Sequence, residues 1–199
     1  MRIIRVTAVA LIAAGLAAAS ATAKTTTYAS TKSSNLLVGI DDEAFTLYGD
    51  PSSAFETLQS LHTQVLRVNL YWGGNRWAVA NSEPANAADP GDSAYSWSLY
   101  DRLARYAANN DIKLLLSIVG TPQWANHGAG KNHAPTSFTA LQQFAQAAAK
   151  RYSGSYVPPA SQADTTLAPA DSPLPAVKMW TAWNEPNNPV FLAPQYKKV

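Results

Sequence analysis

Short apolar runs alternate along the chain with segments whose apolar residues recur every three or four positions. The runs are 36–40, 64–72, 112–119 and 176–183, and each has the length and composition of a buried strand. The spaced segments have the helical period; they carry Phe55, Leu58 and Leu61, then Leu99, Leu103 and Tyr106, then Phe138, Leu141, Ala145, Ala148 and Tyr152. Asp50-Pro51 supplies an N-cap and a first-turn proline for the first helix. Strand–helix alternation of this kind predicts a parallel sheet with right-handed crossovers.

Two architectures fit that alternation, an open doubly wound sheet and a (β/α)8 barrel. No Gly-rich fingerprint follows the first strand, which argues against a dinucleotide site. In both architectures the catalytic and binding residues lie at the carboxyl ends of the strands. The polar stretches there are Asp41-Asp42-Glu43, 69–72, 120–126 and Asn184 onward. The Pro-rich segment 153–175 directly precedes a strand. We therefore expect it to lie at the amino ends of the strands, away from the catalytic residues.

The first 23 residues have the pattern of a secretory signal peptide. Arg2 and Arg5 form a basic start, residues 6–19 are apolar, and Ala21-Thr-Ala23 provides the small residues of a cleavage site. The alternative is an N-terminal membrane anchor, although the apolar run is short for a span. We therefore expect residues 1–23 to be removed, residues 24–35 to form a flexible lead-in and residues 36–199 to form the domain. The expected location is extracellular or periplasmic, with no membrane attachment after cleavage.

Composition narrows the function classes. The chain has 199 residues and no Cys, which excludes a disulfide scaffold, a thiolate metal site and a cysteine nucleophile. Without Arg2 and Arg5 the number of basic residues equals the number of acidic residues, 13. The domain therefore lacks the excess positive charge that is typical of proteins that bind nucleic acid. His127 and His133 lie in a predicted loop and are expected to be solvated, so we expect no metal and no cofactor. Six Trp and nine Tyr either fill the core or stack on sugar rings.

The stretch Trp183-Asn-Glu-Pro-Asn187 carries the strongest candidate for catalysis. It places Glu185 just past a buried strand, and Pro186 fixes the turn that follows. Trp180, Trp183 and Asn184 are expected to desolvate the carboxyl group and tune its pKa for proton donation. The alternative is an ordinary strand-end glutamate that caps a loop.

Asn184-Glu185-Pro186, after an apolar strand ending in Trp, resembles the strand-four motif of the retaining glycoside hydrolases with (β/α)8 barrels. Leu66-Arg-Val-Asn69 and residues 118–125 agree with the same superfamily, most closely with cellulase-like family 5 enzymes, with xylosidase-like family 39 as a neighbour. The resemblance implies an α/β fold, the N-terminal half of a (β/α)8 TIM barrel, with four parallel strands and helices outside. It implies a polysaccharide or oligosaccharide substrate, with Glu185 as general acid/base. Asn184 would bind the sugar 2-hydroxyl, and Arg67 would lie beside the nucleophile.

Each remaining site residue has a structural alternative. Arg67 is either part of the site or the partner of a buried carboxylate. Trp72 and Trp124 follow strand ends and either stack on sugar or anchor loops. The acidic run at 41–43 either binds a cation or, as we favour, caps the first strand with one member facing the cleft.

A complete barrel needs about 250 residues, and the resemblance places the nucleophile on a seventh strand. We therefore expect this chain alone to be inactive in glycoside hydrolysis. We also expect strand residues such as Leu66, Val68, Leu114 and Leu116 to be exposed to water, which would favour aggregation or pairing of two chains. The alternative function is a non-catalytic carbohydrate-binding or remnant half-barrel.

Overall fold

The computed structural model describes residues 36–196. The predicted signal peptide, 1–23, and lead-in, 24–35, lie outside the described residues. The strands are β1 (Gly39–Asp41), β2 (Val65–Tyr71), β3 (Lys113–Val119) and β4 (Met179–Ala182). The α-helices are α1 (Pro51–Ser60), α2 (Ser98–Asn109) and α3 (Phe138–Arg151), and two single 3₁₀ turns occupy Gln123–Ala125 and Ala160–Gln162. In the described part of the chain, no helix combines the length and apolar character that crossing a membrane requires.

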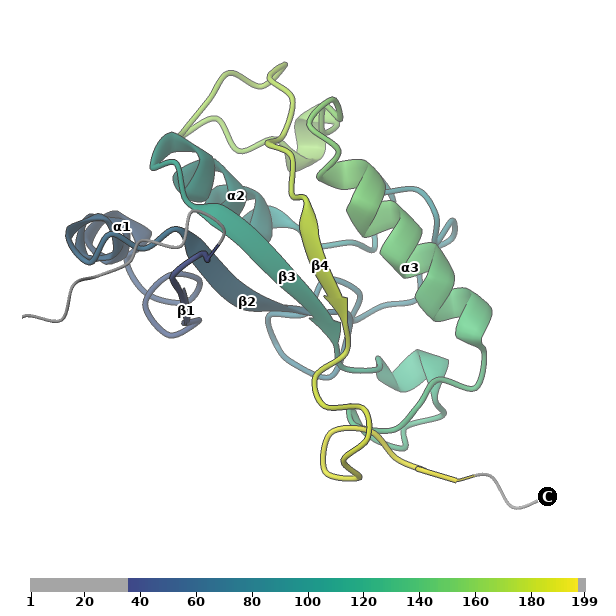
Figure 1. Ribbon diagram of the computed structural model, residues 1–199. Coiled ribbons are helices and arrows are strands. Elements are labelled where there is room, and N and C mark those ends of the chain that lie inside the picture. Colours follow the sequence, from purple (N-terminus) through teal and green to yellow (C-terminus); the bar gives the residue numbers. More distant parts are fainter. Residues whose placement is uncertain (1–35, 197–199) are drawn as a thin grey trace, which may run out of the picture. The chain divides into compact units, whose positions relative to one another are not determined.

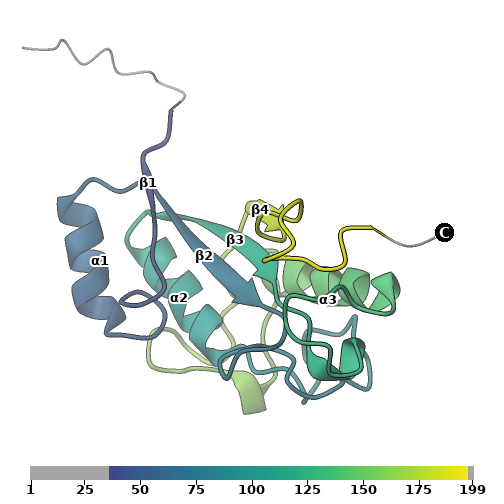
Figure 2. The same cartoon turned by 90° about the horizontal axis from the view of Figure 1, so that it is seen from below.

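The four strands form one parallel sheet in the order β1-β2-β3-β4. Each strand therefore pairs with the next one in the sequence, as neighbouring strands of a (β/α)8 barrel do, and the order shows none of the reversal that defines a doubly wound sheet. The three helices lie on one side of the sheet (Figures 1 and 2). The predicted α/β fold, four parallel strands of a half barrel with the helices outside, is confirmed.

Alternation along β2 gives the sheet two different faces. Leu66, Val68 and Leu70 point toward the helices and are fully buried, whereas Arg67 and Asn69 between them lie on the opposite, open face and are partly exposed. In β3, Leu114 and Leu116 are buried in the same way. The expectation that these leucines and Val68 are exposed to water is therefore wrong. The helices cover them, and the open face carries polar residues from β2, β3 and β4.

Aromatic side chains fill the space between the sheet and α3. Phe144 of α3 stacks on Trp72 and on Trp97, with ring centroids 5.8 Å apart in both pairs. Tyr95 packs edge-on against Trp97 at 5.3 Å. All four side chains are buried. These aromatic residues form the core, and stacking at such distances adds about 1 kcal/mol per pair beyond the area they bury.

A buried ion pair joins α2 to the end of α3. The Arg151 guanidinium donates to both carboxylate oxygens of Asp101, at 2.9 and 2.5 Å, and neither side chain is more than 2% exposed. Tyr152 donates a further hydrogen bond of 3.0 Å to Asp101, and Arg151 donates one of 2.8 Å to Gln162. This cluster ties the segment 153–175 to the helices, and it satisfies the charges that burial would otherwise leave unpaired.

The helices and strands form where the sequence pattern predicts them, but the burial of the first strand and the buried face of the third helix differ from the prediction. Asp50 caps α1 as predicted, accepting a 3.0 Å hydrogen bond from the Ser52 amide. The first strand is not buried: β1 is shorter than 36–40 and exposed, because it is an edge strand of the described sheet. The buried face of α3 is Phe144, Ala147, Ala148 and Arg151, and Phe138 is 74% exposed.

Candidate active site

Arg67 connects elements from all four strands on the open face of the sheet. Its guanidinium forms a salt bridge with Asp41 at the end of β1 and donates a 2.9 Å hydrogen bond to Oδ1 of Asn184, which follows β4. Its Nε donates to Ser117 Oγ of β3 at 3.2 Å, and Thr181 of β4 donates to the same oxygen at 2.6 Å. The predicted Arg67 and Asn184 are thus in contact. The carboxylate partner of Arg67 is Asp41, which is half exposed rather than buried.

This contact fixes the orientation of the Asn184 amide. A guanidinium group has only donors, so the oxygen of Asn184 must face Arg67. The NH2 group of Asn184 is then the part of the side chain left to donate to another group. Since Asn184 lies at the carboxyl end of a parallel strand, its free donors are placed where substrates bind in barrels of this kind.

The turn that carries Glu185 has an unusual backbone. Trp183 has φ 70° and Glu185 has φ 43°, both in the left-handed region that residues other than glycine rarely adopt. The turn is held by hydrogen bonds from the Trp183 amide to Ile118 O, 2.8 Å, and from the Asn188 amide to Glu185 O, 2.9 Å. Strain of this kind costs about 1–3 kcal/mol per residue and concentrates at functional sites.

The Glu185 side chain is exposed, so the expected desolvation by Trp180 and Trp183 is wrong for this structure. Trp180 lies on the helix side of β4, where its ring is 6.4 Å from that of Tyr152. Glu185 lies three residues past the end of β4, in the turn with the left-handed backbone.

A small cavity of about 130 Å³ lies beside Asn184 at the carboxyl ends of the strands. Its walls include Asn69, Tyr71, Lys131, Trp183 and Asn184. Burial is the main cause that raises the pKa of Tyr71, and the negative charge of Glu43 adds to it. The tyrosine is therefore a neutral hydroxyl group under ordinary conditions. The cavity offers amide and hydroxyl groups together with aromatic surface.

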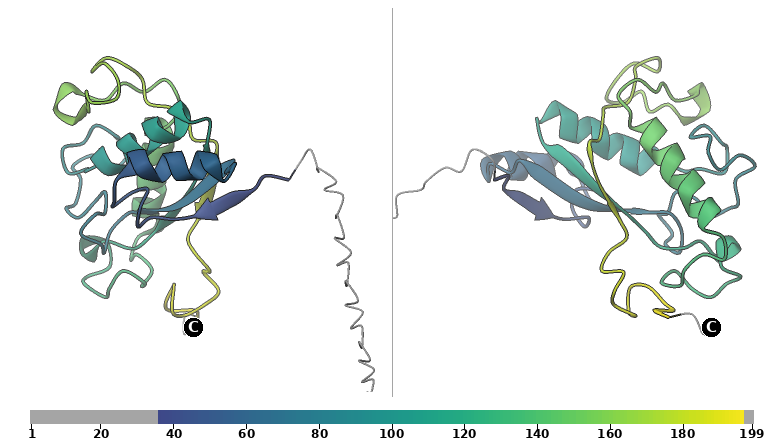
Figure 3. Two further views of the ribbon diagram at one scale, coloured as in Figure 1. Left: turned by 90° about the vertical axis from the view of Figure 1, so that its left-hand side faces the viewer. Right: turned by 45° about the vertical axis from the view of Figure 1, so that its right-hand side comes forward.

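The loops after β3 and β4 form one wall of this cavity. The Ala193 amide donates to Asn132 O at 2.7 Å, and the Ala134 amide donates to Ala193 O at 2.8 Å. Trp183 Nε1 donates to Phe191 O at 2.7 Å, which closes the second loop on itself. The right panel of Figure 3 shows the segment after β4, in yellow, continuing past the end of the strand.

The acidic run 41–43 divides into three roles. Asp42 accepts hydrogen bonds from the amides of Phe45 and Thr46, at 3.2 and 2.9 Å, and so caps the turn after β1. Asp41 pairs with Arg67 on the open face. Glu43 accepts a 3.0 Å hydrogen bond from the Asn69 amide, extending the contact between the first two strands. The prediction that this run caps the end of the first strand is confirmed by Asp42, and a member that faces a cleft stays a prediction.

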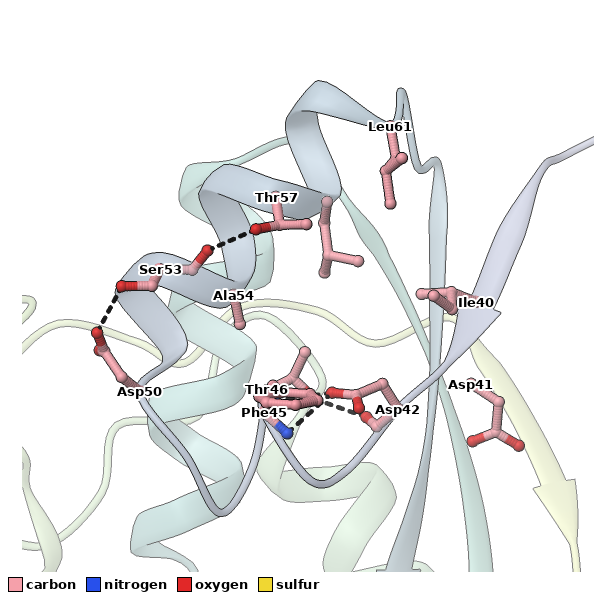
Figure 4. A pocket seen from close by; sticks show the side chains of 11 residues that line it. Ile40, Asp41, Asp42, Phe45, Thr46, Asp50, Ser53, Ala54, Thr57 and Leu61 are labelled. Carbon is pink, nitrogen blue, oxygen red and sulfur yellow. Dashed lines mark hydrogen bonds between the residues drawn. The ribbon is translucent and has the colours of Figure 1, made fainter.

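A larger cavity of about 470 Å³ lies between β1 and α1, on the helix side of the sheet. Ile40, Phe45, Leu58 and Leu61 supply its apolar surface. Figure 4 shows the polar groups beside it engaged with their own turns, and the Asp41 carboxylate directed away from α1. This cavity is therefore not part of the candidate active site.

The two tryptophans predicted to bind substrate have different positions. Trp72 is fully buried between Trp124 and Phe144, so it cannot stack on a sugar, and that prediction is wrong. The Trp124 ring is partly exposed, and its Nε1 anchors a loop by donating to Ala80 O at 2.9 Å. Substrate binding by Trp124 stays a prediction. Among residues 36–196, no three His, Asp or Glu side chains gather in a way that could hold a metal ion.

Comparison with known proteins gives a likeness at the level of structure only. No family model matches the sequence, and no curated protein matches it. Among solved structures, an endo-1,4-β-mannanase from Rhizomucor miehei aligns with a TM-score of 0.45 and 17% sequence identity. The alignment covers 73% of this chain and 43% of the mannanase, so the chain corresponds to less than half of that enzyme. The assignment of a site therefore rests on the geometry described above.

Proposed function

We propose that this chain is the N-terminal part of a secreted retaining glycoside hydrolase that cleaves O-glycosidic bonds in polysaccharides. The observation that supports the proposal best is the hydrogen bond between Arg67 and Asn184. It joins β2 to the residue directly before Glu185, at the carboxyl end of a consecutive parallel sheet. The motif Asn184-Glu185-Pro186 resembles that of the cellulase-like enzymes, which makes a family 5 type of activity the specific form of the proposal.

In this proposal Glu185 is the general acid/base. Its exposed carboxyl group protonates the departing glycosidic oxygen, and the resulting carboxylate then removes a proton from the attacking water. A retaining mechanism needs a second carboxyl group about 5 Å away to act as the nucleophile. We assign that group to a residue beyond the four described strands, because Asp41 is already paired with Arg67.

Asn184 has a separate role in the proposal. Arg67 holds its oxygen, which leaves the NH2 group to donate to the 2-hydroxyl oxygen of the sugar bound next to Glu185. A hydrogen bond to this hydroxyl strengthens as the ring approaches the transition state, and together with distortion of the ring it contributes several kcal/mol in glycoside hydrolases.

The test uses the complete secreted protein that contains this chain, assayed against glucan, mannan and xylan. Turnover of at least one glycan, lost in Glu185→Gln, would support the proposal. Glu56→Gln is the matched control, since Glu56 is an exposed glutamate on the outer side of α1. Oligosaccharide binding without turnover would replace the proposal with the non-catalytic alternative, and turnover unaffected by Glu185→Gln would remove Glu185 from the mechanism.

A further inference from the structure

Lys131 is held in a defined position at the small cavity, although it lies in a loop. Its carbonyl oxygen accepts a 2.8 Å hydrogen bond from the Thr121 amide. The next residue, Asn132, is bound to Ala193 in the opposite loop. Gly74, with φ 71°, lies so close that an added Cβ would overlap the Cβ of Lys131. Three separate contacts therefore fix where the Lys131 side chain begins.

The Lys131 ammonium group has no carboxylate partner within 4 Å among the described residues. Instead it lies 5.9 Å from the centre of the Tyr71 ring, on the wall of the cavity. A cation over an aromatic face is weakly stabilised, so its charge is still free to attract an anion. Glu43, whose negative charge acts on Tyr71, already accepts hydrogen bonds from the Asn69 amide and the Tyr48 hydroxyl.

The same cavity contains a polar atom without a partner. Asn69 Oδ1 is buried and accepts no hydrogen bond from any described residue. An unpaired buried acceptor is destabilising, and a hydrogen bond from a ligand hydroxyl group would satisfy it. The cavity thus presents one unmet acceptor, the free NH2 group of Asn184 and one unpaired cation.

We propose that this cavity is a subsite for a sugar that carries a negative charge, with Lys131 binding the anionic group and Asn69 accepting from a hydroxyl. The inference rests on the proposed function, because it names the substrate class of the same site. The anionic group is a uronic acid carboxylate or a sulfate ester, which share the chemistry that Lys131 recognises. Neutral hexose units would occupy the subsite without using the lysine.

Ligand-observed NMR on the complete secreted protein that contains this chain tests the inference. The probes are a β-1,4-linked glucose trisaccharide, the same trisaccharide with one glucuronate, and one with a single sulfate ester. The proteins are the unchanged chain, Lys131→Gln and the control Lys150→Gln, which removes a lysine on the exposed side of α3. An exposed charge pair contributes up to about 1 kcal/mol, so Lys131→Gln should weaken binding of a charged probe roughly fivefold.

The expected result is that at least one charged probe binds more tightly than the neutral one. That preference should disappear in Lys131→Gln, persist in Lys150→Gln and weaken as NaCl is raised. The probe with the larger preference identifies carboxylate or sulfate. Equal binding of all three probes, unchanged in Lys131→Gln, would overturn the inference and leave the proposed function intact. If none of the probes binds, the inference fails together with sugar recognition by this site.

Discussion

The guanidinium of Arg67 and the side-chain oxygen of Asn184 are 2.9 Å apart, although 117 positions separate them in the sequence. The parallel arrangement brings them together, because β2 and β4 have their carboxyl ends on the same side of the sheet and only β3 lies between them. The bond orients the residue next to Glu185, so changes at Arg67 should affect the site without touching a substrate.

Arg67→Lys should release Asn184 while keeping a positive charge beside Asp41. Lysine cannot reproduce the guanidinium geometry that contacts Asp41, Ser117 and Asn184 together. Because the Arg67–Asp41 pair is partly exposed, we expect a loss of only about 1 kcal/mol in the free energy of unfolding. The Asn184 side-chain amide signals should nevertheless move in NMR spectra. Unmoved signals would show that Arg67 does not position Asn184.

Glu185→Gln should slow hydrolysis of natural glycans far more than hydrolysis of activated aryl glycosides. A good leaving group departs without a proton, so removal of the general acid costs less for such substrates. The measurement is kcat/KM for a series of leaving groups on the complete protein. An equal loss for all leaving groups would argue against an acid role.

Asn184→Ala should lower kcat with a smaller effect on KM, since the proposed bond to the 2-hydroxyl strengthens in the transition state. The unchanged protein should show the same fall in kcat on a substrate that lacks the 2-hydroxyl. The variant should then show little further loss on that 2-deoxy substrate. Independent, additive losses would mean that Asn184 acts elsewhere.

Asp101→Asn should strongly destabilise the fold. It leaves the buried Arg151 guanidinium without its anion, and breaking such a pair costs about 3–5 kcal/mol. Denaturant unfolding would measure the loss. Asp171→Asn, at an exposed position of the segment 153–175, is the control and should stay within about 0.5 kcal/mol of the unchanged chain. A small effect of Asp101→Asn would contradict the structural role of the pair.

Stability should fall as the pH rises above about 10. Burial raises the pKa of Tyr100 and of Tyr152 above the ordinary value near 10, so in this range the unfolded chain gives up protons that the folded chain keeps. Each such tyrosine contributes full stability below pH 10 and loses about 1.4 kcal/mol per pH unit above it. Tyr152→Phe should reduce this slope, whereas Tyr196→Phe, at an exposed position, should not. Unfolding measured between pH 8 and 11 decides the matter.

The fold could be predicted largely from hydrophobic period, because apolar runs and helical spacings mark the strands and helices directly. The contact between Arg67 and Asn184 was not predicted, because the hydrophobic pattern does not give the reach of a side chain in the middle of β2. The exposure of β1 could not be predicted, because it depends on whether another strand lies beside this edge of the sheet. The position of Trp72 was predictable: alternation from Leu66, Val68 and Leu70 places it on the helix side. Lys131 gave no signal, because only the folded path of two loops brings it to the cavity.

The main-chain hydrogen bonds between the loops after β3 and β4 have a mechanical consequence for Glu185. Because Ala193 is bonded to Asn132 and Ala134, the segment that carries the glutamate cannot swing independently of its neighbour. Any widening of the cleft must either move both loops together or break these bonds. A substitution near His133, which pairs with Ala193 in an isolated bridge, would therefore act on the loop that carries Glu185.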